Sequence, residues 1–237
     1  MTNTDVTQLD NPLWYALKGA QQAYAIGSSH IRRYRSGILP FAAYDYRSPG
    51  NIAELDSFLE KDEVFFLVGA LPSLPSHWKL IRELPCAQMT LELPPAPLQT
   101  TTAVTALTAA DRDTMFELIH RVQPGYYEPD THQLGNYFGI WQDDKLVAIA
   151  GERMRLEGMV EISAVCTDPA YTGRGYAQQL IVHICRTNLE KGNMLFLHVL
   201  TSNERAIRLY EHLGFRQRRV ISFWKLINAG TILGTKL

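Results

Sequence analysis

The sequence has few cysteines, no long apolar run and almost no net charge, and each of these absences excludes a class of protein. Its three cysteines (Cys86, Cys166 and Cys185) are odd in number and lack Cys-x-x-Cys spacing, so neither a disulfide framework nor a zinc site is expected. The seven histidines show no ligand spacing either, and we predict that the protein holds no metal. No uninterrupted apolar stretch approaches the roughly 20 residues that a membrane helix needs.

The net charge and the first residues indicate which partners and which cellular compartment to expect. Lysine and arginine (23) nearly balance aspartate and glutamate (24), and the net charge of −1 gives the chain no electrostatic reason to bind nucleic acid or an acidic membrane. The opening residues, MTNTDVTQLDNPLW, contain no basic region followed by an apolar stretch, so no signal peptide is expected. We therefore expect a reduced, cytoplasmic setting with no nucleic-acid or membrane partner. The sequence leaves a homodimer open.

A stretch rich in proline and threonine divides the chain. Residues 91–107, LELPPAPLQTTTAVTAL, have the composition of a linker. We therefore predict an N-terminal α/β domain over 1–98 and a second domain over 99–237, both of ordinary size. Helices are expected at NPLWYALKGAQQAYAIG (11–27), NIAELDSFLEKD (51–62) and PSHWKLIREL (75–84), and strands at EVFFLVGA (63–70) and AQMTLEL (87–93).

The second domain has a more regular pattern of strands and helices. A helix is expected over 109–122, followed by a loop and three consecutive strands that are joined by tight turns. Strands and helices then alternate. The expected strands are YFGIWQ (137–142), LVAIAGERMRL (146–156), MVEISAVCT (159–167), MLFLHVL (194–200) and FRQRRVISFWKL (215–226), and the expected helices are 177–190 and SNERAIRLYEHLG (202–214). This order predicts an α/β fold with a mixed sheet and helices packed on it.

Two glycines, Gly173 and Gly175, flank Arg174 where the helix at 177–190 begins. A helix N-terminus offers unpaired N–H groups, and glycine lets a ligand approach the backbone, so the pattern favours phosphate binding. A tight turn without a ligand would also explain it. A P-loop requires Gly-Lys-Ser/Thr, but Tyr176 follows Gly175. A dinucleotide fingerprint requires a small residue where Gln178 stands, so both of these motifs match poorly.

Residues 161–215 closely resemble the core of the GNAT superfamily, the acetyl-CoA-dependent N-acetyltransferases. The loop TGRGYA (172–177) resembles the family's Arg/Gln-x-x-Gly-x-Gly/Ala, except for threonine at the first position. The block NERAIRLYEHLGF (203–215) resembles the family's Asn-x-x-Ala-x-x-x-Tyr-x-x-x-Gly-Phe. The resemblance covers roughly residues 103–226. It implies a GNAT acyl-CoA N-acyltransferase fold, a mixed sheet of six or seven strands with helices on both faces, preceded by the smaller α/β domain.

The resemblance also implies a cofactor and residues that hold it. Coenzyme A, carrying an acetyl group, would place its pyrophosphate against the N–H groups of residues 174–177, and its pantetheine amides along the end of the strand at 159–167. The implied cofactor-binding residues are Val165, Cys166, Thr167, Thr172, Gly173, Arg174, Gly175, Tyr176, Ala177 and Asn203. Asn203 has a second interpretation as the cap of the last helix. The N-terminal domain is interpreted as a degenerate copy of the fold, and without a Gly-x-Gly loop it is not expected to bind coenzyme A.

Acetyl transfer to an amine needs one group to accept the amine proton and another to protonate the departing thiolate. Tyr210 matches the family tyrosine and is the candidate acid. His198 is a candidate base because its ordinary pKa, near 6.5, suits proton acceptance at neutral pH. Glu161 and Glu152 are rival bases on neighbouring strands, and ordered water is a further alternative. Each of these side chains also has an interpretation as a structural residue.

The expected function is transfer of an acetyl group from acetyl-CoA to a primary amine of a small molecule or amino acid, by direct attack in a ternary complex. Two alternatives stay open, a peptide or protein N-terminal acetyltransferase and a non-catalytic acyl-CoA-binding regulatory module. The intact second motif, with Tyr210, favours an enzyme over the regulatory module. The near-neutral charge gives no support for a strongly basic, histone-like substrate.

Overall fold

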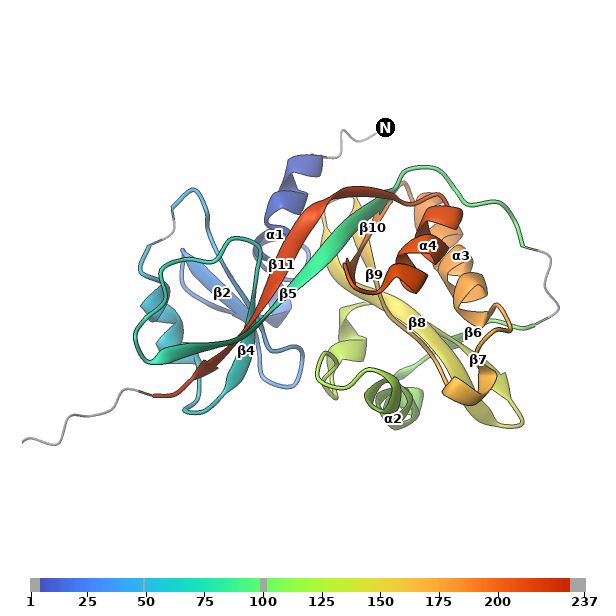
Figure 1. The fold of residues 1–237 in the computed structure, drawn as a ribbon, viewed down its shortest axis with the longest axis horizontal. Coiled ribbons are helices and arrows are strands. Elements are labelled where there is room, and N and C mark those ends of the chain that lie inside the picture. Colours follow the sequence, from blue (N-terminus) through green and yellow to red (C-terminus); the bar gives the residue numbers. More distant parts are fainter. Residues whose placement is uncertain (1–4, 49, 99–101, 231–237) are drawn as a thin grey trace, which may run out of the picture.

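The computed structural model of the chain describes residues 5–48, 50–98 and 102–230. Its strands form one mixed sheet of eleven strands (Figure 1). The strands are β1 (Ala25–Gly27), β2 (Ile31–Tyr34), β3 (Phe41–Tyr44), β4 (Val64–Val68), β5 (Trp78–Leu91), β6 (Thr105–Leu107), β7 (Tyr137–Gln142), β8 (Lys145–Leu156), β9 (Met159–Thr167), β10 (Met194–Leu200) and β11 (Arg216–Asn228).

Four α-helices and six short 3-10 helices connect these strands within the described residues. The α-helices are α1 (Pro12–Lys18), α2 (Arg112–Val122), α3 (Tyr176–Leu189) and α4 (Glu204–His212). The 3-10 helices are η1 (Val6–Asp10), η2 (Gln22–Tyr24), η3 (Ile52–Phe58), η4 (Ala109–Asp111), η5 (Thr131–Leu134) and η6 (Pro169–Tyr171). None of the helices in the described ranges is long and apolar enough to cross a membrane.

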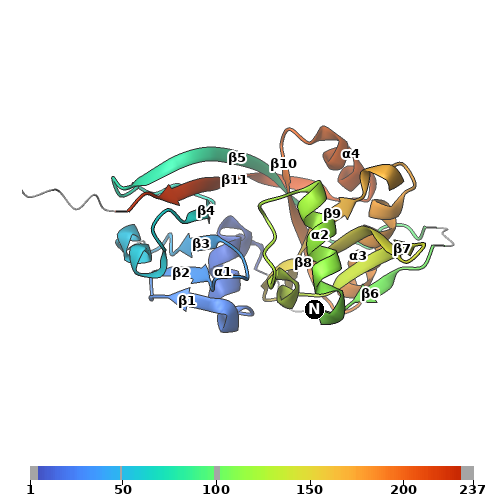
Figure 2. The ribbon, with the colours of Figure 1, turned by 90° about the horizontal axis from the view of Figure 1, so that it is seen from below.

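Two long strands, β5 and β11, join the two halves of the molecule. The strand order is β1-β2-β3-β4-β11-β5-β10-β9-β8-β7-β6, so β11 lies beside β4 and β5 lies beside β10. Leu226 on β11 pairs with Phe65 on β4, and Leu197 on β10 pairs with Met89 on β5. Figure 2 shows both strands running side by side from one half to the other. Each half therefore contributes a strand to the sheet of the other.

The same sequence of pairings occurs in both halves of the sheet. In the N-terminal half, β2 and β3 are antiparallel, β3 and β4 are parallel, and β4 pairs antiparallel with β11. In the C-terminal half, β8 and β9 are antiparallel, β9 and β10 are parallel, and β10 pairs antiparallel with β5. This topology is what a degenerate copy would show. The division into domains 1–98 and 99–237 stays a prediction, and residue 99 lies outside the described residues.

Helices cover both faces of the C-terminal half, as expected. Because neighbouring strand residues point to opposite faces, Ala148 and Ala150 on β8 pack in one apolar cluster with Leu180 of α3, whereas Ile149 packs with Leu118 of α2. Six strands, β6 to β11, come from residues 105–228. The expected α/β fold with a mixed sheet is therefore confirmed.

The halves also share an apolar core. One cluster of buried side chains combines Leu13 and Phe41 from the N-terminal half with Met154, Phe196 and Phe223 from the C-terminal half. Burial of such side chains is the main stabilising contribution in a fold of this kind. The halves are thus joined by packing as well as by the exchanged strands.

Three expectations for the N-terminal half were wrong in detail. The segment 75–84 is no helix, because residues from Trp78 onward form the first part of β5 and pair with β11, which supplies backbone partners that outweigh the local helical pattern. The segment 51–62 forms the 3-10 helix η3. The helix expected over 11–27 ends at Lys18, and β1 begins at Ala25.

Candidate active site

The glycine-rich loop leads directly into α3. Gly173 and Gly175 have φ angles of +79° and +76°, the left-handed region that favours glycine. Gly175 is the N-cap of α3 and no side chain caps the helix start. A Cβ on Gly173 would meet nothing within 4 Å, so open space lies beside the loop. The guanidinium of Arg174 lies over the ring of Tyr171, 4.8 Å from its centroid. The loop thus combines an uncapped helix start, a cation and room for a ligand.

Beside this loop, β9 and β10 separate. They pair in parallel up to Ile162 and Leu197. Beyond that point β9 continues beside β8 and β10 continues beside β5. Ala164 has a φ of +52° where the β8–β9 register shifts, which marks a bulge in β9. The gap between the strands leaves the edge of β9 at residues 163–165 without a β10 partner.

A cavity of about 780 Å³ occupies this gap and extends to both faces of the sheet. On one side it is lined by the glycine loop and α4, and on the other by Ile119 of α2 and Tyr127 of the following loop. Phe41, Leu84 and Cys86, all N-terminal to the predicted linker, line it as well. The volume lies in the range of pockets that hold small ligands.

The structure brings nearly all of the predicted cofactor-binding residues to this cavity. The lining includes Val165, Thr167, Thr172, Gly173, Arg174, Gly175, Tyr176, Ala177 and Asn203. Cys166 differs, because its side chain is buried on the other face among residues of α2. Only its backbone is left for a ligand. Asn203 does cap α4, because its side chain accepts a hydrogen bond from the Ala206 N–H (3.2 Å).

Tyr210 also lines the cavity, from the last part of α4. Burial raises the pKa of its phenol, and the nearby Cys166 thiol adds to the rise. Its hydroxyl therefore remains protonated at neutral pH. A protonated phenol at a cavity wall can donate a proton or a hydrogen bond to a developing thiolate.

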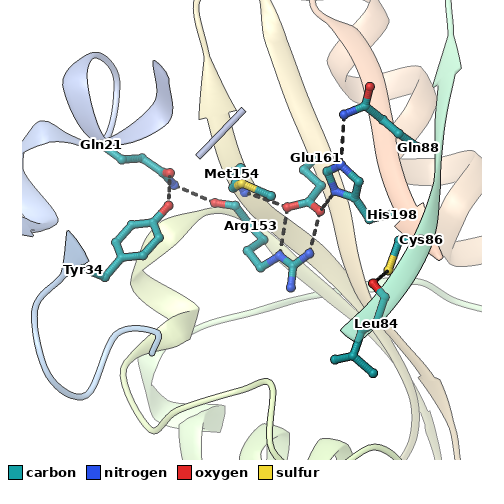
Figure 3. Close-up of polar contacts among 9 residues, drawn as sticks. All are labelled: Gln21, Tyr34, Leu84, Cys86, Gln88, Arg153, Met154, Glu161 and His198. Carbon is teal, nitrogen blue, oxygen red and sulfur yellow. Dashed lines mark hydrogen bonds and ion pairs between the residues drawn. The ribbon is translucent and has the colours of Figure 1, made fainter. Parts of the chain in front are cut away.

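The other two predicted catalytic residues belong to a buried polar ladder that crosses four neighbouring strands (Figure 3). Glu161 on β9 accepts hydrogen bonds from Arg153 Nε (2.8 Å) and Nη2 (2.6 Å), and from the Met154 N–H (3.2 Å). His198 Nδ1 lies 2.8 Å from Glu161 Oε1. The side chains of Glu161 and His198 are each 1% exposed.

The hydrogen bonds of Gln88 fix the proton on His198. Gln88 Oε1 accepts from Arg218 (3.0 Å), which can only donate, and Nε2 donates to the Leu9 carbonyl oxygen (2.8 Å), which can only accept. The Gln88 nitrogen therefore faces His198 Nε2, 3.1 Å away, and that ring nitrogen must accept. The proton lies on Nδ1 and is donated to Glu161. Both ring nitrogens of His198 are thus occupied, Nδ1 by Glu161 and Nε2 by Gln88.

This geometry argues against Glu161 and His198 as bases. Burial alone would raise the pKa of Glu161, but the charge and hydrogen bonds of Arg153, together with His198, lower it to about 2. Its carboxylate is a weak base that is turned toward its partners. Glu152, the rival base, is buried and accepts hydrogen bonds from the Asn136 N–H (3.0 Å) and Asn188 Nδ2 (2.7 Å). Burial alone would raise the pKa of Glu152. The hydrogen bonds from Asn136, Asn188 and Arg155 outweigh burial, so the pKa lies below its ordinary value.

Sequence reasoning missed Arg153, Phe41 and Phe223. The Arg153 guanidinium lies beside both rings, 5.2 Å from the centroid of Phe41 and 5.8 Å from that of Phe223, and the two centroids are 5.8 Å apart. One signal for Arg153 was available in the sequence. Arg153 and Glu161 lie on the two strands of one predicted hairpin, at similar distances from its turn at residues 157–158, so the two side chains could be expected to meet. Nothing in the sequence placed Phe41 there, since it comes from the other half. Within the described ranges, no group of three or more histidine, cysteine, aspartate or glutamate side chains could hold a metal ion.

Several known proteins are similar to this chain in sequence or in fold. The family described as FR47-like protein matches residues 137–224. A solved structure from Novosphingobium aromaticivorans, assigned to the GNAT family of acetyltransferases, is 36% identical, with a TM-score of 0.86 over 94% of this chain and 99% of that one. A GCN5-related N-acetyltransferase from Kribbella flavida, 15% identical, shares the fold with a TM-score of 0.62 over 98% of each chain.

Curated relatives match a shorter region. N-alpha-acetyltransferase RimI of Mycobacterium tuberculosis is 33% identical over 57 residues, 24% of this chain and 35% of that protein. Glucosamine 6-phosphate N-acetyltransferase of Trypanosoma brucei brucei is 38% identical over 55 residues, 23% of this chain and 36% of that protein. The chain therefore spans about a third of the length of these relatives, and the two differ in the acceptors that their names give.

Proposed function

Because the chain belongs to the GNAT family of N-acetyltransferases, we propose that it transfers the acetyl group of acetyl-CoA to a primary amine of a small molecule or amino acid, by direct attack in a ternary complex. The observation that carries the choice of acceptor is the shape of the cavity. Phe41, Leu84 and Cys86 of the N-terminal half line the same space as the glycine loop and Tyr210. An acceptor in that space is enclosed by both halves, which suits a small molecule better than a folded protein.

The residues of the loop and of β9 fit coenzyme A. The N–H groups at the uncapped start of α3 and the Arg174 guanidinium would hold the pyrophosphate, since a helix N-terminus attracts anions. The edge of β9 at residues 163–165, which β10 leaves unpaired, would accept and donate backbone hydrogen bonds to the pantetheine amides. Bound there, the cofactor supplies an acetyl thioester. Thr172 stands where the family loop has arginine or glutamine. Its hydroxyl donates a hydrogen bond to the Pro169 carbonyl oxygen (3.1 Å) and so stabilises the turn before the loop.

Tyr210 is proposed as the general acid. In the reaction, the amine nitrogen forms a bond to the acetyl carbon and the carbon–sulfur bond breaks. The Tyr210 hydroxyl would give its proton to the departing sulfur, and the proton on the amine would leave to solvent. Solvent would then return one proton to the Tyr210 phenolate, so the general acid is restored. Burial keeps the Tyr210 phenol protonated until the sulfur develops charge. General acid catalysis of this kind contributes about 10²–10⁴-fold to a rate.

No carboxylate is placed to accept the amine proton. Among the described residues that line the cavity, none is an aspartate or glutamate. Since His198 and Glu161 face each other and Arg153, we propose that they hold the guanidinium in place, and that water carries the amine proton away. An acceptor with a low amine pKa should therefore react faster at neutral pH.

An acceptor screen tests the proposal. Free thiol release from acetyl-CoA is measured over a panel of amines, amino acids and short peptides, with the Gly175→Asp variant as a control for cofactor binding. We expect turnover with small amines or amino acids, and at least tenfold lower kcat/KM for acetyl-CoA with Gly175→Asp. Turnover confined to peptides would favour the N-terminal acetyltransferase alternative. Cofactor binding without turnover on any amine would favour the regulatory module.

A further inference from the structure

Arg153 presents an unused nitrogen to the cavity. Its Nε and Nη2 are bound to Glu161 (2.8 and 2.6 Å), whereas Nη1 forms no hydrogen bond with any described residue. Figure 3 shows this third nitrogen away from the Glu161 carboxylate. The side chain is 11% exposed, packs beside Phe41 and Phe223, and is anchored by its two hydrogen bonds to Glu161. Arg153 lines the cavity. An N–H donor whose position is set by the ion pair with Glu161 is thus available to a ligand there.

Two tyrosines of the same cavity also lack partners. The hydroxyls of Tyr127 and Tyr137 are buried and have no hydrogen-bond partner among the described residues. The two rings lie 5.9 Å apart, edge to face, and both residues line the cavity. The two hydroxyls lie close together. Burial raises the pKa of the Tyr127 phenol, and a weak hydrogen-bonding contact from Tyr137 opposes the rise, but this contact lacks the distance and angle of a normal hydrogen bond. Buried hydroxyls without partners are uncommon because they lose their bonds to water.

Arg153 and Tyr137 lie near each other. Burial raises the pKa of the Tyr137 phenol, nearby Tyr127 adds to the rise, and the charge of Arg153 opposes it. Gly151, which pairs with Tyr137 across β7 and β8, leaves room for the ring. A Cβ on Gly151 would come within 2.2 Å of that ring. The Tyr137 ring therefore packs on Gly151 of β8, and Arg153 follows two residues later on the same strand.

The charges of the cavity indicate what these donors bind. The charged residues that line it are Arg153, Arg174, Arg205 and Arg208, without a lining aspartate or glutamate in the described ranges. Arg174, Arg205 and Arg208 belong to the glycine loop and α4, whereas Arg153 lies on β8 beside Phe41 of the N-terminal half. Glu161 already neutralises much of the Arg153 charge. One nitrogen of a partly neutralised guanidinium and two hydroxyls suit a singly charged group that only accepts hydrogen bonds.

We propose that the acceptor carries a carboxylate, bound by Arg153 Nη1 and the hydroxyls of Tyr127 and Tyr137, which positions its amine toward Tyr210. This inference rests on the proposed function and narrows it to amines with a free carboxylate, such as amino acids. Arg153, Tyr127 and Tyr137 are binding residues, and Glu161, His198 and Gly151 are positioning residues. A dianionic phosphate is less suited, because the adjacent Glu161 carboxylate would repel its second charge.

The first experiment compares L-amino acids with the matching L-amino-acid amides, in which a neutral carboxamide of similar size replaces the carboxylate. Thiol release from acetyl-CoA gives kcat and KM for each pair, corrected for the fraction of free amine, and thermal unfolding with coenzyme A present measures binding without turnover. We expect at least one free acid to exceed its amide tenfold or more in kcat/KM, and to raise the unfolding temperature more than the amide does.

The second experiment uses Tyr127→Phe and Tyr137→Phe, singly and together. Each variant removes a hydroxyl that has no partner, so the unfolding temperature of the free protein should stay level or rise. For the preferred free acid, KM should rise about tenfold with little change in kcat, and the preference over the amide should fall. Tyr46→Phe is the matched control. Its hydroxyl donates to the Val68 carbonyl oxygen (3.0 Å) and accepts from the Ala70 N–H (2.8 Å), so this variant should lose stability and keep KM.

Several outcomes would overturn the proposal. One is equal use of acids and amides, and another is an acid preference that survives in the double variant. A third is preference for glucosamine 6-phosphate over both glucosamine and every free acid, which would indicate a phosphate subsite.

Two outcomes separate the subsite from the proposed enzyme function. Absence of turnover with every amine, while free acids still stabilise the protein more than amides, would refute the proposed enzyme function and keep the carboxylate subsite. Absence of both turnover and stabilisation by any free acid would refute the subsite.

Discussion

Replacing Glu161 by glutamine should cost stability in a way that depends on pH. The folded protein holds the pKa of this carboxyl near 2, against an ordinary value of 4.5, because Arg153 and His198 outweigh the effect of burial. A shift of this size corresponds to about 3 kcal/mol, since one pKa unit is worth about 1.4 kcal/mol. A buried ion pair that loses one partner costs a similar amount, about 3–5 kcal/mol. We therefore expect Glu161→Gln to lower the free energy of unfolding by about 3 kcal/mol at pH 7.

The sign of the pH dependence follows from the lowered pKa. Stability from a carboxyl with a depressed pKa is complete above the unfolded value, near 4.5, and is lost as the pH falls toward 2. The difference between parent and Glu161→Gln should thus shrink to about 2 kcal/mol at pH 3.5. Urea unfolding at pH 7, 5 and 3.5 measures it.

The matched control is Glu204→Gln, because Glu204 forms an exposed ion pair with Arg208 (3.1 Å) and should contribute almost nothing. The double variant Arg153→Gln with Glu161→Gln should cost less than the sum of the two single changes, since the partners are in direct contact. Parallel stability curves for parent and Glu161→Gln over this pH range would refute the electrostatic reasoning and leave only a packing contribution.

Three further predictions concern the cofactor loop and α4. Gly175→Asp should weaken coenzyme A binding at least tenfold in calorimetry, about 1.4 kcal/mol, whereas Gly192→Asp, at a glycine with a similar φ of +79° outside the cavity, should leave it unchanged. Tyr210→Phe should reduce turnover by about 10²–10⁴-fold with little change in acetyl-CoA affinity, and turnover within about twofold of the parent would eliminate the acid role. Asn203→Ala removes the cap of α4 and should lower stability by about 1 kcal/mol in urea unfolding; an unchanged midpoint would show that the cap contributes nothing.

The exchanged strands have a consequence for the two halves. β11 pairs with β4 in the N-terminal half, and β5 pairs with β10 in the C-terminal half. If the chain were cut between residues 98 and 99, the N-terminal piece would keep β5 but lose β11, which pairs with β4. The C-terminal piece would keep β11 but lose β5, which pairs with β10. The cavity depends on the same arrangement, because β5 brings Leu84 and Cys86 to its wall. The predicted linker therefore divides the sequence into two parts, but it does not divide the sheet, which contains strands from both parts.

Local patterns were sufficient for most of the C-terminal half. The strands at 137–142 and 194–200 and the helix α4 lie where turn residues, caps and apolar periodicity predicted them, because each of these signals acts over a few residues. The loop with Gly173 and Gly175 could be predicted for the same reason, since its left-handed φ angles require glycine whatever the rest of the fold does. The segment 75–84 could not, because its strand exists only beside β11, more than 130 residues later in the chain.

The sequence by itself determined the family, the glycine loop before α3 and the tyrosine at the cavity, because the motifs that carry them are short and contiguous. Only the tertiary structure decided what Glu161 and His198 do. Their hydrogen bonds involve Arg153 from β8 and Gln88 from β5, and the distance and direction of those partners are set by strand pairing. The part of the cavity near Arg153, where we propose that the acceptor binds, was decided in the same way. A fixed nitrogen of Arg153, two buried hydroxyls and Phe41 meet there because β8, β7 and the N-terminal half pack around one gap, which no contiguous stretch of sequence encodes.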